Sequence, residues 1–585
     1  MFKFVRVIAG ADNQFERHLD GVKRLFETVF PFNLAYLDKI DAYAAGNHPA
    51  GAESVLMAAT GPRGNVIGFT VTFYFADIRA AYLDYLASDP GRAARGIGGA
   101  LYETMRDDMQ KRGARRLFLD SLPDDPGSNV AAELLPANRK RMAFYERLGA
   151  RPIMGTRYEW TVTPANLGDP NMLLCDNMGE SRPLRRKRLA EVFERIMLAK
   201  VGLPADAPLV RELVDSIHDD PVALRAPRYP FPKLRELPAL QAPIDLVETG
   251  GADDIPHSPF NGYYERPARV AAITRALQDL PLRRHAIEEF GLAPIRKLHD
   301  RRMVDFLEES ATRLQPGQIL YPEIFPMRYA DRLPKSWPMR AGYFCIDTST
   351  PITSTAYAAA RRSANASLTG ARLLADGRSR MCYVAGRPPG HHAERRVFGG
   401  FCYFNNAALA ANHLAHKGRV AVLDIDHHHG NGTQDIFWER SDVMTVSLHC
   451  NPLDSYPFFA GFADEVGAGE GLGFNLNIPL DPGADDQVYL KALDRALKAI
   501  RRFQPQALVV SLGVDIMRGD PTGSFFITPE GMRRIGAAIG GLGLPSLIIQ
   551  EGGYHLQNIR RGVRSFLAGC AVALLTEDDK GKVQH

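Results

Sequence analysis

The sequence predicts an α/β protein built from more than one domain, on three observations. Its 585 residues exceed a single hydrophobic core, which stops growing near ~250–300 residues, so two or three domains are expected. Charged residues at 24% and hydrophobic residues at 45% are typical of soluble globular proteins and exclude a largely disordered or collagen-like chain. Short apolar strands also alternate with helical periodicity along the chain, which indicates mixed α/β structure.

Residues 1–165 form the first predicted domain. Apolar strands are expected at 54–59, 66–74 and 116–119, with helical stretches between them, and 159–163 closes the pattern as another strand. This alternation indicates an α/β or α+β unit.

Residues 166–240 are predicted to be a partly helical connector. A basic cluster at 182–188 precedes apolar residues at helical spacing, and 202–204 ends the run. Those apolar residues are Leu189, Val192, Phe193, Ile196 and Met197. The cluster is either a nucleic-acid arm or the solvated start of an amphipathic helix, and the absence of interleaved aromatic residues favours the helix.

Residues 241–585 form the largest predicted part. Apolar strands at 420–425, 507–512 and 546–549 alternate with helical patterns, which predicts a parallel sheet flanked by helices. In such sheets, functional sites lie at the carboxyl ends of the strands.

Charge and cysteine content limit the partners and the compartment. Lys and Arg number 71 against 67 Asp and Glu, and a net charge of +4 over this length predicts neither a nucleic-acid nor a membrane partner. The six cysteines form no Cys-x-x-Cys pair, which favours reduced thiols in the cytoplasm over a disulfide framework or a cysteine zinc site. No apolar run reaches the ~18–20 residues of a membrane span, and charge interrupts residues 1–10, which predict a strand. The sequence leaves open whether the protein is a homo-oligomer.

Acidic and imidazole side chains gather where two of the predicted strands end. Alternation places Asp424, Asp426 and His428 on one face, and Asp515 ends a second strand at the same edge of the sheet. Three Asp and His ligands leave a fourth position for water, as in catalytic zinc sites, so the implied chemistry is hydrolysis. A His-His-His run alone is more often polar surface, but unpaired buried carboxylates are costly, which favours the metal.

Two further segments could supply proton-transfer groups. His391 and His392 follow the strand at 381–385 in a constrained turn, so one of them is a candidate general base. Tyr554 follows two glycines at another strand end and could donate a hydrogen bond to an oxyanion. Alone, Tyr554 would be a core or rim residue, so its role depends on the neighbouring strands.

A glycine-rich loop in the first part could bind an anion. Residues 82–101 read as strand, loop and helix, with Gly96, Gly98 and Gly99 offering backbone N–H groups at a helix N-terminus. A pyrophosphate suits such a loop, although an ordinary tight turn explains a Gly-x-Gly equally well.

The C-terminal part resembles the zinc-dependent histone deacetylase superfamily over residues ~241–575. The motifs that carry the resemblance are RPPGHHA (387–393), GGFCYFNNAALAA (399–411), LDIDHHHGNGTQDIFW (423–438), VSLH (446–449), VSLGVD (510–515) and EGGY (551–554). The segments FPMR…GYFCIDTSTPIT, SYPFFAGFADEVG and DPTGSFFIT are most similar to its acetylpolyamine amidohydrolase branch. The resemblance implies the arginase–deacetylase α/β fold.

This resemblance also implies a role for each motif residue. The zinc ligands would be Asp426, His428 and Asp515, the tandem histidines His391 and His392, and the carbonyl-polarising phenol Tyr554. A potassium ion would be held by Asp424 with backbone oxygens of Ser447 and Leu448. Asn431 would stand behind His392, while Phe401 would line the acyl-lysine tunnel and Asp347 would lie at its rim.

The expected substrates are small acetylated amines, acetylpolyamines or acetyl-lysine compounds. The Pro-rich stretch 315–351 looks like the loop that narrows the tunnel entrance in the acetylpolyamine amidohydrolase branch. Carboxylates near the mouth are few, with Glu323 and Asp347 as candidates, so no strict preference for long polyamines is expected.

The N-terminal part resembles the GNAT acetyltransferases over residues ~1–165. The glycine loop and the segment from Asn138 to Ala150, which contains AFYERLGA, carry this resemblance. It implies acetyl-CoA, with Tyr145 as general acid toward the thiolate. The coenzyme-binding residues would be Arg95, Gly96, Ile97, Gly98, Gly99, Ala100 and Asn138.

Together the two resemblances predict a bifunctional protein, an α+β acetyltransferase domain followed by a zinc deacetylase. The alternative keeps the deacetylase as the single enzyme and makes residues 1–165 a module that binds acetyl-CoA or substrate. Ala93, where the acetyltransferase family usually has Gln or Arg, favours that alternative.

Overall fold

The computed structural model divides into two compact units, 2–233 and 234–585, and each is described by itself. The structure describes residues 3–10, 14–61, 64–91, 96–125, 132–158, 171–231, 233–234, 236–250, 255 and 264–576. The strand predicted at 159–163 lies outside these residues.

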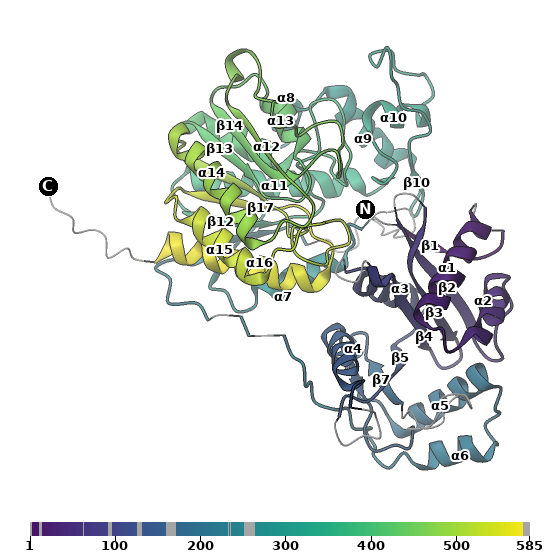
Figure 1. Cartoon of the computed structure of the whole chain (residues 1–585). Helices are drawn as coiled ribbons and strands as arrows, with labels where there is room; N and C mark the ends of the chain where they lie inside the picture. The colour runs from purple at the N-terminus through teal and green to yellow at the C-terminus, as the bar shows by residue number, and fades with distance from the viewer. Residues whose placement is uncertain are drawn as a thin grey trace. The chain divides into compact units, whose positions relative to one another are not determined.

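The described part of the first unit contains a seven-stranded sheet (Figure 1). In spatial order its strands are β1 (Lys3–Arg6), β2 (Glu53–Thr60), β3 (Val66–Phe75), β4 (Ala80–Ser88), β5 (Arg116–Ser121), β7 (Met172–Asp176) and β6 (Ala150–Pro152). Neighbouring strands are antiparallel except β4 and β5, which are parallel. The strands expected at 54–59, 66–74 and 116–119 correspond to β2, β3 and β5.

The parallel pair in this sheet is short. Residues 80–83 of β4 pair with 116–119 of β5, and both strands continue beyond the paired stretch. On the other edge of β4, Leu83 pairs with Thr72 and Tyr85 with Val71, so Asp84 is the extra residue of a β-bulge. Because bulges redirect a strand and its side chains, this one marks the point where β4 and β5 separate.

Helices cover both faces of this sheet. Their bounds are α1 (Phe15–Val29), α2 (Leu37–Ala44), α3 (Ile97–Lys111), α4 (Leu135–Leu148), α5 (Arg186–Val201) and α6 (Pro208–Asp215). Helices α1, α2, α5 and α6 share one hydrophobic core with the sheet, whereas α3 packs on the opposite face, against Gly68. The apolar stripe expected at 189–197 is the buried face of α5, and the basic residues Arg185–Arg188 at its start are exposed.

The second unit contains an eight-stranded sheet among its described residues, and every neighbouring pair is parallel. In spatial order the strands are β15 (Asn475–Leu480), β14 (Val443–Cys450), β13 (Val420–Asp424), β16 (Ala507–Leu512), β17 (Ser546–Gln550), β12 (Met381–Ala385), β8 (Ile244–Glu248) and β9 (Leu282–His285). A small separate pair joins β10 (Ile319–Leu320) to β11 (Ile352–Thr353). The predicted parallel α/β architecture is confirmed.

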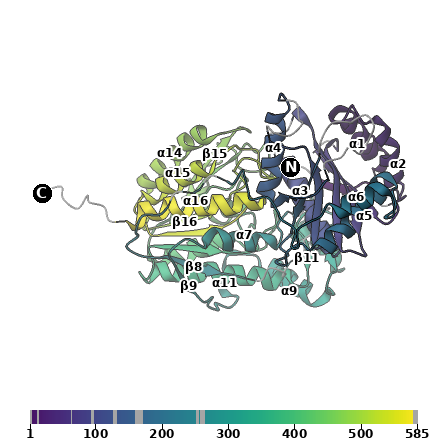
Figure 2. The ribbon, with the colours of Figure 1, turned by 90° about the horizontal axis from the view of Figure 1, so that it is seen from below.

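Helices flank this sheet on both faces, as can be followed in Figures 1 and 2. One face packs in a single core against α7 (Ala268–Leu277), α14 (Asp486–Phe503), α15 (Pro529–Gly540) and α16 (Leu556–Leu575). The remaining helices are α8 (Ala293–Leu298), α9 (Arg301–Arg313), α10 (Ala341–Phe344), α11 (Ala356–Ala375), α12 (Asn406–Leu414) and α13 (Asn431–Phe437), of which α11, α12 and α13 contact the sheet directly. Across the residues described, no helix combines the length and the apolarity needed to cross a membrane.

Candidate active site

Four adjacent strands of the second unit deliver the candidate site at their carboxyl ends. Asp426 and His428 follow β13, Asp515 follows β16, Tyr554 follows β17, and the histidine pair follows β12. The strands are mainly apolar and buried, apart from the last residue of β12, and polar residues gather where each one ends. Segments far apart in the sequence therefore meet at one edge of the sheet, as expected for a parallel α/β fold.

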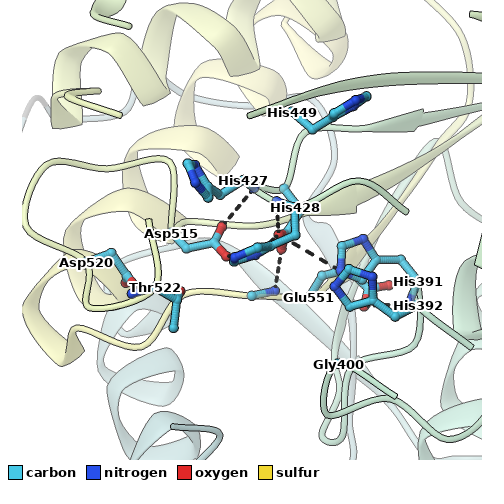
Figure 3. Close-up of polar contacts among 12 residues, drawn as sticks. His391, His392, Gly400, His427, His428, His449, Asp515, Asp520, Thr522 and Glu551 are labelled. Carbon is cyan, nitrogen blue, oxygen red and sulfur yellow. Dashed lines mark hydrogen bonds and ion pairs between the residues drawn. The ribbon is translucent and has the colours of Figure 1, made fainter. Parts of the chain in front are cut away.

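Asp426, His428 and Asp515 form a compact buried group, and Figure 3 shows the side chains of His428 and Asp515 next to each other. One ligand atom from each lies within 4.8 Å of those from the other two. Nδ1 of His428 is 3.3 Å from Oδ1 of Asp426 and 3.2 Å from Oδ2 of Asp515. The structure thus brings together the three residues that the sequence analysis assigned to the metal.

The electrostatics of this group fit a divalent cation. Oδ2 of Asp515 is buried, and Nδ1 of His428 lies 3.2 Å from it without normal hydrogen-bond geometry. Burial, together with the charge of Asp426, raises the pKa of Asp515 to about 7. Two carboxylates and one imidazole are a donor set that zinc accepts, and a dication would relieve the repulsion between the carboxylates.

Glycine at position 552 is required by the crowding around the carboxylates. A Cβ atom there would lie 2.4 Å from Oδ2 of Asp515 and 2.5 Å from Oδ2 of Asp426. The Gly552 N–H instead donates to Oδ2 of Asp426 at 2.8 Å. Close approach of the backbone therefore orients one of the carboxylates.

The two tandem histidines lie beside this group but differ in their partners. Nδ1 of His391 is 2.9 Å from Oδ2 of Asp424, and Nδ1 of His392 is 2.8 Å from Oδ1 of Asn431. Burial opposes protonation of His391, but the charges of Asp424 and Asp426 outweigh it and raise its pKa to about 10. Burial and the charges of His391 and His428 hold the pKa of His392 well below its usual value. His391 is therefore protonated and His392 neutral near pH 7, which suits His392 to accept a proton.

Tyr554 is held by contacts that the sequence analysis did not identify. Its backbone N–H donates to Oδ2 of Asp520 at 2.7 Å, and the Arg269 guanidinium lies 4.9 Å from its ring centroid. Nε of Arg269 also donates to the Gly553 carbonyl at 2.7 Å. Burial raises the pKa of Tyr554 well above its usual range, so its phenol keeps the proton needed to donate a hydrogen bond.

The predicted tunnel residues lie around the same edge. Phe401 is 4% exposed, and its ring meets that of Tyr554 edge-on with centroids 5.5 Å apart. Oδ2 of Asp347 accepts a 2.6 Å hydrogen bond from the Gly400 N–H. A Cβ atom at Gly400 would lie 2.2 Å from the His392 ring, so Asp347 anchors a loop that passes directly over that histidine.

Sequence reasoning gave no role to three residues that contact the candidate site, Tyr456, Asp520 and Arg269. The ring of Tyr456 lies 4.8 Å from that of His392 and 6.4 Å from that of His428, yet its segment SYPFF served only as a family signature. Asp520 was part of an Arg-Gly-Asp-Pro turn with no role assigned. Arg269 is a buried cation in α7. Its contact with the Gly-Gly-Tyr segment that follows β17 becomes visible only when the two segments are placed in three dimensions.

The residues expected to hold potassium are neighbours in the sheet. Asp424 at the end of β13 pairs with Ser447 of β14, and Leu448 is the next residue of that strand. All three are buried. A further group that could hold a metal is His391, Cys402 and Glu551, but Oε2 of Glu551 already accepts from the Gly390 N–H at 2.6 Å.

The glycine loop of the first unit leads into α3. Gly96 is the N-cap residue with a φ of 70°, a left-handed conformation that favours glycine. The Ala100 N–H donates to the Gly96 carbonyl at 3.0 Å, and helix geometry leaves the N–H groups of Ile97, Gly98 and Gly99 without a partner inside the helix. Arg95 lies outside the described residues.

The other predicted coenzyme residues lie on α4. Burial raises the pKa of Tyr145 to about 12, so its phenol is protonated, as a general acid requires. Asn138 is 1% exposed, and its amide donates to the Pro123 carbonyl at 3.0 Å. Asn138 therefore fixes the chain that follows β5.

The parallel sheet and the buried Asp–His–Asp group beside a histidine pair define the deacetylase class of α/β proteins. The chain belongs to the histone deacetylase domain family, whose sequence model matches residues 263–570. The model of the GNAT acetyltransferase family matches residues 20–150. Both resemblances drawn from the sequence are confirmed.

The relatives found by sequence and structure cover the second unit. The chain is 43% identical over 311 residues to an acetylpolyamine amidohydrolase of Burkholderia pseudomallei, covering 52% of this chain and 89% of that one. It is 37% identical over 331 residues to an acetylpolyamine amidohydrolase of Mycoplana ramosa, covering 56% and 95%. A crystal structure of an acetylpolyamine aminohydrolase from Burkholderia pseudomallei superposes with a TM-score of 0.53 at 38% identity, over 56% of this chain and 98% of that one.

Proposed function

We propose that the second unit is a zinc-dependent amidohydrolase that removes acetyl groups from N-acetylated amines. The observation that carries the proposal is the buried group of Asp426, His428 and Asp515 beside a neutral histidine and a protonated tyrosine. Asp424 with the backbone oxygens of Ser447 and Leu448 would hold a potassium ion behind the site.

The proposed reaction follows from the protonation states of the side chains. Bound at Asp426, His428 and Asp515, zinc would supply Lewis-acid chemistry. His392, neutral and held by Asn431, accepts the proton of the attacking water at Nε2. The Tyr554 hydroxyl donates to the oxygen that becomes negatively charged. The proton on His392 then passes to the nitrogen of the leaving amine, and acetate and a free amine are the products.

His391 has a different task in this scheme. Its imidazolium is fixed by Asp424 and lies next to His392, with ring centroids 4.0 Å apart. Burial and the positive charge of His391 hold the pKa of His392 low, so His392 is neutral until the water proton arrives. The two histidines therefore act as one unit, with a single proton acceptor.

We propose small acetylated amines, including acetylated diamines and acetyl-lysine compounds, as the substrate class. The names of the relatives support acetylated polyamines, and the loop expected at the entrance adds little negative charge for a long polycation. Within that loop, Met327 is 97% exposed. Arg340 of the same loop lies 3.6 Å from Glu309, so this cation already has an acidic partner.

Metal removal tests this function directly. Acetate release from an acetylated 1,4-diaminobutane should disappear after dialysis against a chelator and return on addition of zinc. Metal analysis should find zinc bound in proportion to the restored activity. Full turnover by metal-free protein would exclude the proposed chemistry.

We propose acetyl-CoA-dependent transfer to an amine as a second function, located in the first unit. The match to the GNAT family and the glycine-lined N-terminus of α3 support it. The alternative is a module that binds acetyl-CoA or substrate without catalysis. Release of CoA thiol by the full chain with a panel of primary amines distinguishes the two, and Tyr145→Phe should slow that release while leaving coenzyme affinity unchanged.

A further inference from the structure

A lysine of the first unit ends in a complete set of hydrogen-bond acceptors. Nζ of Lys200, on α5, donates to Oη of Tyr82 at 2.6 Å and to Oδ2 of Asp120 at 2.9 Å. It also lies 3.3 Å from Oδ1 of Asp84 and 4.9 Å from the centroid of the Tyr82 ring. An ammonium group has three N–H donors, and the three oxygens match them in number. The aromatic ring adds a cation–π contact with the positive charge.

The sheet itself creates this arrangement. Asp84 is the bulge residue of β4, and Asp120 follows the last residue of β5 that pairs with β4. Both carboxylates therefore stand where the two parallel strands separate. Their side chains are 3% and 16% exposed, and that of Lys200 is 15% exposed.

Further hydroxyl groups hold the two carboxylates in place. The Tyr82 hydroxyl donates to Oδ2 of Asp120 at 2.7 Å, and the Tyr36 hydroxyl donates to Asp84. The phenol of Tyr158 also interacts with the Asp120 carboxylate. The cluster is thus assembled before any cation enters it.

The charge of the cluster favours a cation. Two carboxylates face one ammonium, so a negative charge remains after Lys200 is counted. Burial opposes protonation of Lys200, but the charges of Asp120 and Asp84 outweigh it and raise the pKa of the lysine. An empty cluster would bury two carboxylates without a counter-ion, which costs several kcal/mol.

We propose that Tyr82, Asp84 and Asp120 form a binding site for a primary ammonium group and that Lys200 is its internal occupant. An amine ligand reaches these groups only by displacing the lysine. The site belongs to the first unit and is independent of the hydrolase proposed for the second unit.

The ammonium site lies on one face of the sheet, and the predicted coenzyme loop lies on the other. Lys200 approaches from the face covered by α5, whereas α3 with its glycine loop covers the other face. The ammonium therefore stands where β4 and β5 separate, on the sheet face opposite to α3. That this is the acceptor position of a transferase rests on the second function proposed above.

Replacing Lys200 by alanine tests the ammonium site. The substitution removes three methylene groups and the ammonium, which is the size of n-propylammonium. Calorimetry should show that Lys200→Ala binds n-propylammonium at least ~10-fold more tightly than the parent chain. The same ligand should raise the thermal transition of the variant by mass action. The neutral isostere 1-propanol should do neither.

Matched controls separate this result from general charge effects. Lys187→Ala removes an exposed lysine from the same helix and should behave as the parent does. Adding Asp84→Asn to Lys200→Ala should abolish the binding of n-propylammonium. Equal affinities of Lys200→Ala and the parent, or binding that survives Asp84→Asn, would overturn the proposal.

Two measurements complete the test. If Lys200→Ala does not fold, acylation of the parent chain by an N-hydroxysuccinimide ester gives an independent readout. Lys200 should react far more slowly than Lys187, and equal labelling would refute occupancy of the site. Release of CoA thiol with n-propylamine should be faster for Lys200→Ala than for the parent. Binding without any such release would remove the acceptor role and leave the ammonium site intact.

Discussion

Replacing Tyr554 by phenylalanine should remove one hydrogen bond that forms in the transition state and little else. The ring stays where it is because its supports do not involve the hydroxyl: Asp520 holds the backbone N–H, and Arg269 and Phe401 pack against the ring. Deleting one oxyanion donor in a water-poor site typically costs ~10²–10³-fold in turnover, or about 2.7–4 kcal/mol. Tyr554 is 5% exposed, which places the expected loss within that range.

The assay compares kcat, KM and metal content for the variant and the parent with an acetylated diamine. We expect kcat to fall ~10²–10³-fold, while KM changes little and zinc content stays the same, since the tyrosine is not among the metal ligands. Tyr329→Phe is the matched control, because this hydroxyl belongs to a residue that is 72% exposed. Unchanged turnover in Tyr554→Phe would remove the phenol from the mechanism, and loss of zinc would show that its effect is structural.

Other expectations concern the metal, the coenzyme, the substrate and acid stability. Asp426→Ala and His428→Ala should lose zinc in metal analysis, and zinc retained by both would place the metal elsewhere. Gly98→Glu should abolish acetyl-CoA binding in calorimetry without unfolding, because a Cβ there meets only side chains at 3.7 Å or more; unchanged affinity would make the loop an ordinary turn. Comparison of kcat/KM should show no peptide preference above ~100-fold (about 2.7 kcal/mol) over an acetylated diamine. Burial lowers the pKa of His299 to about 4, so the unfolded chain binds the extra proton. The free energy of unfolding should therefore fall by up to ~3 kcal/mol between pH 6.5 and 4, and a flat profile in denaturant titrations would contradict this.

Much of the second unit follows from local patterns in the sequence. Continuous apolar runs predicted the central strands, and the alternation of Asp424, Asp426 and His428 predicted which side chains share a face. Because parallel strands end at a common edge, the proximity of Asp515 also followed. The protonation states of the two histidines did not, since they depend on burial and on the charges of Asp424 and His428, which come from a different strand end.

The first unit shows where local patterns stop being informative. The helical periodicity at 189–197 predicted α5 and its buried face, but not that the next charged residue, Lys200, would enter the sheet between two aspartates. A bulge at Asp84 has no signature in the strand sequence, because one extra residue only appears when β3 and β4 are paired. Contacts of this kind depend on register and on packing between segments more than a hundred residues apart.

The assembly of the metal group from several strand ends has a consequence for synthesis of the chain. Gly552, whose N–H orients Asp426, follows that residue by 126 positions, and β12 pairs with β17, near the end of the sequence. A growing chain therefore carries its clustered acidic and imidazole groups long before the last strand closes the sheet. Ordering of this edge must wait until β17 and Gly552 have been synthesised, and a chain that lacked β17 would have no assembled metal group.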